Sequence, residues 1–446
     1  MRTDFRIALL LTRGSDRREG WRIALTAVGA AMATGLCLAA VAISSLQGRY
    51  AMPPAHALLR QPGERAGVVL TLLLLLVPVL GFLGQCARVG AVHRDRRLAA
   101  LRLAGAGPAQ VRRIAALEAG LACLTGSAVA TAVSAGVLLR QWQNPPAVVW
   151  AGFAGIALAV PVLGALVSAL ALRRVVASPL GWVRRVRPSA GRRPGLAVLA
   201  TAVVMLLTGT ALAPRTFGGF ETTPLFVFGV VMVTGAGAIW AAGASARFTG
   251  RVLAERTGNP AVLIAAERLR DDPWAGARTH AAVLLVTVVG TGFVGVRQVL
   301  LDALTGRDRN SLPVDVSFYT TGLDLTGAAI LVALAITLSA LAVGTAESLA
   351  TRRRGLAAQT AAGVPRAVLG RALLLETALP LAPAIALAGA GGLAIGVWYG
   401  QLAGAGFVPV LPLAVPVLVY AACLLAAATS LPLLRRSVRP AELRHA

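Results

Sequence analysis

The chain has 446 residues, of which 57% are hydrophobic and only 14% are charged, and its mean hydropathy is +0.74. Soluble proteins have about 25% charged residues, so this composition excludes a soluble globular protein. The formal net charge is +25, and every Lys or Arg position in the chain is arginine.

Apolar segments long enough to cross a bilayer recur along the whole chain. A span needs roughly 20 apolar residues, and a helix satisfies the backbone polar groups of such a segment in lipid. The hydropathy pattern predicts ten helices, over residues 22–46, 66–87, 114–139, 147–172, 196–213, 224–246, 279–299, 325–349, 372–400 and 410–434. We therefore expect an all-α polytopic membrane protein.

The arginines predict which side of the membrane each connection faces. Cytoplasmic segments carry the excess of positive charge. If the N-terminus is cytoplasmic, 35 of the 43 arginines fall on that side. The distribution predicts that both termini are cytoplasmic, and it accounts for the net charge, with contact to anionic lipid as a side effect. Nucleic-acid binding is disfavoured because no stacking aromatic residues interleave the arginines.

A basic segment broken by glycine occurs twice. Residues 94–118 (RDRRLAALRLAGAGPAQVRRIAALE), the first elbow, and residues 352–376 (RRRGLAAQTAAGVPRAVLGRALLLE), the second elbow, share 11 of 25 positions at a shift of 258. Flanking segments pair at shifts of 256 to 261, as one duplication with small insertions would leave. We predict two parallel four-helix repeats, related by a pseudo-two-fold axis along the membrane normal. The predicted boundaries are 1–190 for the first repeat, 191–250 for two linking helices and 251–446 for the second repeat.

Each elbow is predicted to be a short amphipathic helix, a sharp turn and a second helix that continues into the membrane. In the first elbow, Gly105 ends one helix and Pro108 opens the next. Gly363 and Pro365 take these places in the second elbow. Two such elbows in symmetric positions suit a two-fold partner that docks from the cytoplasm.

These motifs resemble those of the FtsX-like, MacB-like permeases of type VII ABC transporters. The resemblance rests on LRLAGAG…LEAG at Leu101–Gly107 and Leu117–Gly120, and on QTAAGVP…LETA at Gln359–Pro365 and Leu375–Ala378. The 4+2+4 plan looks like the ten-helix, BceB-type branch of that family, without its large extracellular domain.

The resemblance implies a permease subunit of the bacterial plasma membrane, driven by a separate ABC ATPase. In that family the elbow is the coupling helix that sits in a groove of the ATPase, so two elbows imply an ATPase dimer for each permease chain. ATP and Mg would be bound by that partner. The sequence agrees, because a phosphate-binding P-loop needs a lysine and this chain has none. The other expected partners are membrane lipids and a small amphiphilic substrate.

The residues expected to couple to the ATPase lie in the two elbows. In the first elbow they are Arg97, Leu98, Leu101, Arg102, Leu103, Ala104, Gly105, Arg113 and Glu118. In the second elbow they are Arg354, Leu356, Gln359, Ala361, Ala362, Gly363, Arg371 and Glu376. At Arg97 and Gly355 the family has an acidic residue, so the chain departs from the family pattern there.

Glu118 and Glu376 are carboxylates near the cytoplasmic ends of apolar spans. Each would reach the membrane surface or pair with a nearby arginine, such as Arg113 or Arg371. Two other interpretations are that each clamps its elbow to the helix bundle, or that each binds substrate or protons directly.

Gly392, Gly396 and Gly400 form a small-residue face on one helix, which predicts close helix packing. An alternative use of this face is the seam between the two repeats. The polar residues show no catalytic arrangement and no metal-type spacing, so we predict no catalytic, cofactor-binding or metal-binding residue.

The predicted function is export or membrane extraction of an amphiphilic or hydrophobic molecule, or of an antimicrobial peptide. One alternative is a non-transporting FtsX-type mechanotransducer that acts on a cell-wall or signalling partner. An ion-coupled secondary carrier is a weaker alternative, because it would need more polar groups near the helix centres than these spans contain.

Overall fold

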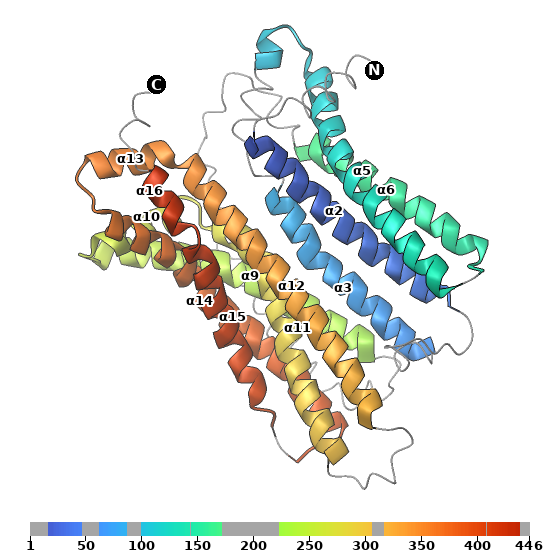
Figure 1. Ribbon diagram of the computed structural model, residues 1–446. Helices are drawn as coiled ribbons and strands as arrows, with labels where there is room; N and C mark the ends of the chain where they lie inside the picture. The colour runs from blue at the N-terminus through green and yellow to red at the C-terminus, as the bar shows by residue number, and fades with distance from the viewer. Residues whose placement is uncertain are drawn as a thin grey trace. The chain divides into compact units, whose positions relative to one another are not determined.

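The computed structural model describes residues 17–46, 62–86, 100–142, 144–171, 223–305, 316–406 and 408–437. All regular structure within these residues is helical (Figure 1). The chain divides into two compact units, residues 1–189 and 190–446. Eight of the described helical segments are long and apolar enough to cross a membrane. The chain is therefore an all-helical protein with several candidate membrane spans.

Four long helices build the described part of the first unit. They are α2 (Arg17–Ser44), α3 (Pro62–Cys86), α5 (Pro108–Gln141) and α6 (Ala147–Ala171). Helix α2 packs against the other three, and α5 also packs along α6. One core cluster of this unit joins Leu38 of α2, Leu138 of α5, and Val149 and Phe153 of α6.

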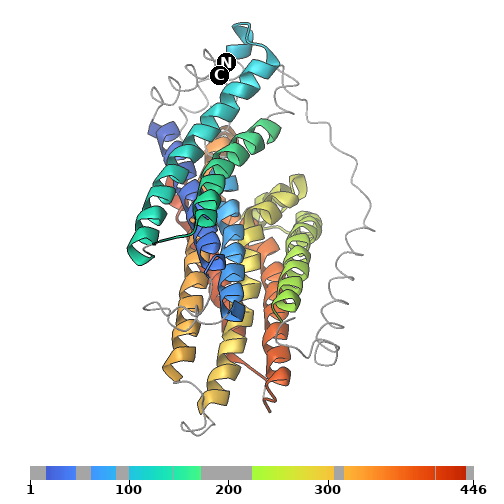
Figure 2. The ribbon, with the colours of Figure 1, turned by 90° about the vertical axis from the view of Figure 1, so that its right-hand side faces the viewer.

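The second unit contains longer helices and several short ones. They are α9 (Thr223–Arg256), α10 (Pro260–Asp271), α11 (Trp274–Thr305), α12 (Val316–Thr351), α13 (Arg353–Ala361), α14 (Arg366–Leu402), the 3-10 turn η2 (Leu411–Leu413), α15 (Ala414–Ala428) and α16 (Leu431–Ser437). Its main core lies where α9, α11 and α14 meet, around Leu284, Leu381 and Ala388. Helix α11 runs lengthwise beside both α12 and α14 (Figures 1 and 2).

The predicted glycine face of α14 packs closely against α11. A Cβ atom placed on Gly392 would lie 2.6 Å from the carbonyl oxygen of Val288, and one on Gly396 would lie 3.0 Å from the Cα of Gly295. Gly400 is also buried. The glycine face of α14 therefore packs against α11 of the same unit. This contact gives no support to the alternative interpretation, that the face forms the seam between the two repeats.

The two units repeat one packing pattern. The two sets compared are α2, α3, α5 and α6 in the first unit and α11, α12, α14 and α15 in the second. In each set the first helix contacts the other three, and the third helix contacts the fourth. Close packing of the first and third helices recurs as well. A Cβ atom on Gly126 of α5 would overlap the backbone at Ala27 of α2.

The eight candidate spans coincide with eight of the predicted segments, and α3 overlaps a further one, 66–87, as far as Cys86. The predicted span 196–213 lies outside the described residues. Several helices extend beyond the predicted edges, such as α12, which begins at Val316 where the span was predicted from 325. The predicted span 410–434 is divided into η2, α15 and α16. Hydropathy marks the part of a helix that suits the hydrocarbon core, whereas the helix itself continues through polar residues at both ends. Helix α10, which lies between predicted spans, was not predicted.

Candidate functional site

The turn of the first elbow is built around Gly105. Residues 100–103 are helical, and Gly105 has a φ of +96°, in the left-handed region that favours glycine. The Gly105 N–H donates to the carbonyl of Arg102 at 3.0 Å, and the Ala106 N–H donates to the carbonyl of Leu101 at 3.0 Å. These two bonds form a Schellman motif, which ends a helix by satisfying its last carbonyl groups.

The second elbow ends α13 with the same motif, 258 residues later. Gly363 has a φ of +92°. Its N–H donates to the carbonyl of Thr360 at 3.0 Å, and the Val364 N–H donates to the carbonyl of Gln359 at 3.0 Å. A Cβ atom on either elbow glycine would meet nothing within 4 Å, so the backbone conformation, and not crowding, requires glycine. The predicted turn is confirmed in both elbows.

The next helix begins immediately after each turn. Helix α5 starts at Pro108 with Gly107 as its N-cap, and α14 starts at Arg366 with Pro365 as its N-cap. Proline holds φ near the helical value and has no N–H to leave unsatisfied in the first turn. The two helices then run for 34 and 37 residues, so the predicted continuation of each elbow into a long apolar helix is confirmed.

A leucine cluster holds the second elbow against its bundle. Leu356 of α13 is 2% exposed and packs with Leu349 of α12, Leu369 and Leu373 of α14, and Leu434 of α16. Burying one leucine contributes roughly 1.5–3 kcal/mol. Leu356 was expected to face the ATPase, but it is a core residue that fixes α13 in place. Helices α10, α13 and α16 gather at this end of the second unit (Figure 1).

The first elbow has a smaller cluster at corresponding positions. Val111 and Ala115 of α5 are buried and pack with Leu101 and Ala106. At the shift of 258, Val111 and Ala115 correspond to the two leucines that α14 contributes to the second cluster. The same positions therefore carry the packing in both elbows, with smaller side chains in the first.

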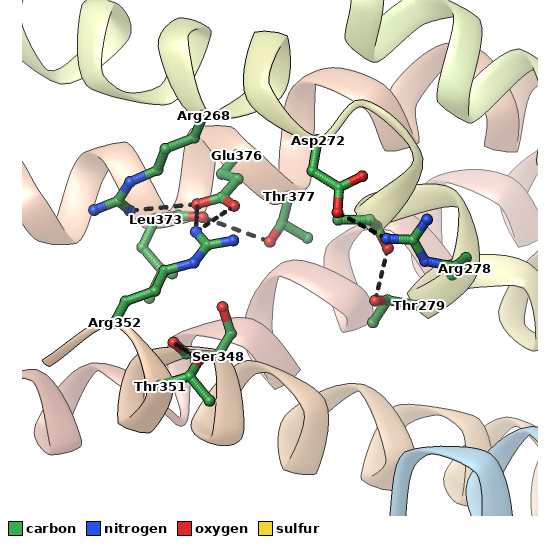
Figure 3. A network of polar contacts seen from close by, with 11 residues as sticks. Arg268, Asp272, Arg278, Thr279, Ser348, Thr351, Arg352, Leu373, Glu376 and Thr377 are labelled. Atoms are coloured by element: carbon green, nitrogen blue, oxygen red, sulfur yellow. Dashed lines mark hydrogen bonds and ion pairs between the residues drawn. The ribbon is translucent and has the colours of Figure 1, made fainter. Parts of the chain in front are cut away.

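Two arginines hold the carboxylate of Glu376. Arg352, between α12 and α13, donates from Nη1 to Oε1 at 2.7 Å and to Oε2 at 3.1 Å. Arg268 of α10 donates from Nη1 to Oε2 at 3.3 Å. Figure 3 shows the two guanidinium groups approaching the carboxylate from different sides. The side chains of Glu376 and Arg268 are only 18% and 17% exposed, so solvent screens the attraction between their charges weakly. Glu376 thus ties three elements together.

The prediction that Glu376 pairs with an arginine is confirmed, but the partner is not Arg371, the arginine given as an example. Arg371 is exposed, and Arg352 and Arg268 hold the carboxylate instead. Residues five apart on a helix point about 140° away from each other, so the two side chains leave α14 in different directions. Glu118, the counterpart in α5, is 3% exposed and does not reach the surface.

Most of the other predicted coupling residues lie on the surface of the elbows. The exposed ones are Leu103, Ala104, Gly105, Arg113, Arg354, Ala361, Ala362, Gly363 and Arg371. Those of intermediate exposure are Leu101, Arg102 and Gln359. Arg97 and Leu98 lie outside the described residues. Leu103, at 89% exposed, is the most exposed large apolar side chain in the described part of the chain.

Sequence reasoning missed Arg268 and the helix that carries it. A local signal for α10 exists: the side chain of Asn259 accepts from the N–H of Ala261 at 3.0 Å, and Pro260 opens the helix. An N-cap residue followed by proline is a typical helix start. No sequence signal, however, connects Arg268 with a glutamate 108 residues further along the chain.

The first elbow lies within a segment that is similar to a known protein family. Residues 68–180 match the model described as FtsX-like permease C-terminal. The chain contains an FtsX-like permease domain. The matched range includes the first elbow, α5 and α6, and it lies in the first unit. No curated protein sequence and no solved structure matches the chain.

The FtsX-like domain bears on what the elbows do. FtsX-like permeases generally pair with ABC ATPases and are typically non-catalytic membrane subunits. The domain therefore suggests that the chain is the permease subunit of an ABC transporter.

Proposed function

We propose that the chain is the transmembrane permease subunit of a type VII ABC transporter. A separate ATPase dimer would drive export or membrane extraction of an amphiphilic or hydrophobic molecule, or of an antimicrobial peptide. The observation that carries the proposal is that the elbow of the FtsX-like domain recurs in the second unit with the same backbone turn.

The recurrence supports a duplicated permease. Both elbows end in a Schellman motif at a left-handed glycine, and the helices that follow pack against the first helix of their own set. We infer ten helices in a 4+2+4 plan, with repeats at 1–190 and 251–446, linking helices at 191–250, a pseudo-two-fold axis along the membrane normal and both termini in the cytoplasm. Two elbows on one chain would then engage the two subunits of an ATPase dimer.

The exposed tips of the elbows have the composition that a coupling contact needs. Leu103 is almost fully exposed, with Ala104 beside it, and Ala361 and Ala362 are exposed in the second elbow. Burial of such an apolar tip in a groove of the ATPase would stabilise the complex. ATP and Mg would be bound by the ATPase, since a chain without lysine has no P-loop.

Aspartate substitutions at the tips test the proposal. The tagged chain is purified from its own host with the ATPase that accompanies it. Replacing Leu103, Ala104, Ala361 and Ala362 by Asp should abolish co-purification of the ATPase, while the chain still inserts into the membrane. The matched control is Val408→Asp: Val408 is 61% exposed and lies beyond the far end of α14, about 55 Å along that helix from the second elbow. It should retain the ATPase.

ATPase that still binds the tip variant with unchanged affinity would show that the elbows are not the docking surface. A second measurement separates transport from transduction. The complex is reconstituted in liposomes, and ATP hydrolysis is followed together with the movement of a fluorescent amphiphile. Hydrolysis that rises with the amphiphile and accompanies its movement supports transport. Hydrolysis without any transported species favours the mechanotransducer.

A further inference from the structure

Helix α10 has a direct polar link to the second elbow. Arg268 of α10 and Arg352 at the start of α13 share the carboxylate of Glu376 (Figure 3). The Arg352 contact is the shorter, with two hydrogen bonds of 2.7 and 3.1 Å, whereas Arg268 makes one bond of 3.3 Å. The Arg268 contact is therefore the weaker of the two ion pairs that Glu376 makes. Arg268 is nevertheless less exposed than Arg352, at 17% against 38%.

The same helix lies flush against α9. Its buried face consists of Ala261, Ala265, Ala266 and Leu269. Gly250 of α9 permits the close approach, since a Cβ atom there would lie 3.0 Å from the Ala266 carbonyl oxygen. At the end of α10, the Arg278 guanidinium of α11 donates to Asp272 at 2.8 Å. Helix α10 is thus held by α9, α11 and α14, and a force applied to it would be shared among them.

We propose that Arg268 is a positioning residue for energy coupling, which makes α10 and α9 move together with the second elbow. This inference rests on the proposed function. When the ATPase displaces the elbow, the Glu376 network carries α10 along, and the packing of α10 carries α9. Without the Arg268 arm, the elbow would still dock, but its movement would reach α10 only through helix packing, with no ion pair to hold α10 to the elbow.

The test uses the full chain with its co-purifying ATPase in lipid nanodiscs, with variants at two neighbouring arginines. Arg268→Gln should leave the affinity for the ATPase within about twofold and lower the permease-stimulated ATP hydrolysis at least about fivefold, the lower end of measured couplings between sites. Arg268→Lys keeps the positive charge and should retain the permease-stimulated ATP hydrolysis. The matched control is Arg270→Gln: Arg270 lies in the same helix, is 57% exposed, and forms an ion pair with Glu267, three residues earlier in α10.

Arg268→Gln that behaves like Arg270→Gln would overturn the inference and leave the proposed function standing. Wild-type chain that holds no ATPase would overturn both. A second measurement needs no change at Arg268. Spin labels are placed at Leu263 of α10 and Ala358 of α13, both exposed, after the four native cysteines have been replaced.

The separation of this pair should change by less than about 2 Å between the nucleotide-free and the vanadate-trapped complex, which is the scale of a helix shift. A reference pair, Ala358 with the exposed Leu331 of α12, should change by more than that. A larger change between Leu263 and Ala358 would show that α10 does not follow the elbow. No change in the reference pair would show that the elbow does not move against its bundle, which also overturns the inference.

Discussion

At the tip of the first elbow Leu103 is 89% exposed, and the equivalent position of the second elbow holds the smaller Ala361. The second elbow also contains a buried leucine, Leu356, which is 2% exposed. The backbone turn is the same in both, down to the positions of its two hydrogen bonds. Turn and side chains therefore serve separate purposes. Glycine and proline set the path of the chain, and the leucines decide whether apolar surface is buried inside the bundle or presented to a partner.

The second elbow is held in place by contacts with other helices of its own unit. Its helix α13 is packed through Leu356 and joined to α14 by the ion pair between Arg352 and Glu376. The described part of the first elbow has a smaller cluster around Val111 and Ala115. We infer that the first elbow contributes more apolar surface to the ATPase contact than the second.

The largest expected effect on stability is that of Leu356→Ala. Removing a leucine from a packed cluster leaves a cavity and costs about 2–5 kcal/mol. Leu101→Ala in the first elbow should cost about 1 kcal/mol, because Leu101 is only half-buried. Denaturant titration of the purified variants in detergent micelles measures both free energies of unfolding. Equal losses would show that the two elbows are anchored alike.

Changes at the turn glycines should affect the two elbows equally. Gly105→Ala and Gly363→Ala each place a Cβ atom on a left-handed residue, which costs about 1–2 kcal/mol. Asparagine tolerates this conformation better and should cost less. The control is Gly355→Ala in α13, where φ is not positive and the added Cβ would meet nothing within 4 Å. That substitution should be neutral or stabilising by about 0.5–1 kcal/mol. A marked difference between Gly105→Ala and Gly363→Ala in the same titration would contradict a shared turn.

The local features of the elbows could be predicted from the sequence because they depend on residues close along the chain. Gly105 and Gly363 each followed a helical pattern, and a proline stood two or three residues later, which is sufficient to specify a helix end and a new start. The long apolar helices were likewise legible from hydropathy.

The polar network around Glu376 could not be predicted in the same way. It joins residues 24 and 108 positions apart, and their proximity follows from how α10, α12 and α14 pack. Arg371 was named as a possible partner because it lies near Glu376 in the sequence. Helical geometry alone argued against that choice, since neighbours on a helix are three or four residues apart. Burial of Leu356 was also missed, because which face of the short helix α13 meets the bundle depends on α16, far along the chain.

The smallest expected effect on stability is that of Leu103→Asp. A side chain that is 89% exposed contacts little of its own chain, so its loss should change the free energy of unfolding by less than about 0.5 kcal/mol. Ala361→Asp should be equally silent in the same titration. The two variants should separate only in affinity for the ATPase, where a buried leucine contributes roughly 1.5–3 kcal/mol and an alanine much less. Binding curves measured with each single variant test this directly. A stronger effect of Ala361→Asp would reverse the assignment of the two elbows, because the tip with less apolar surface would then be the one on which docking depends.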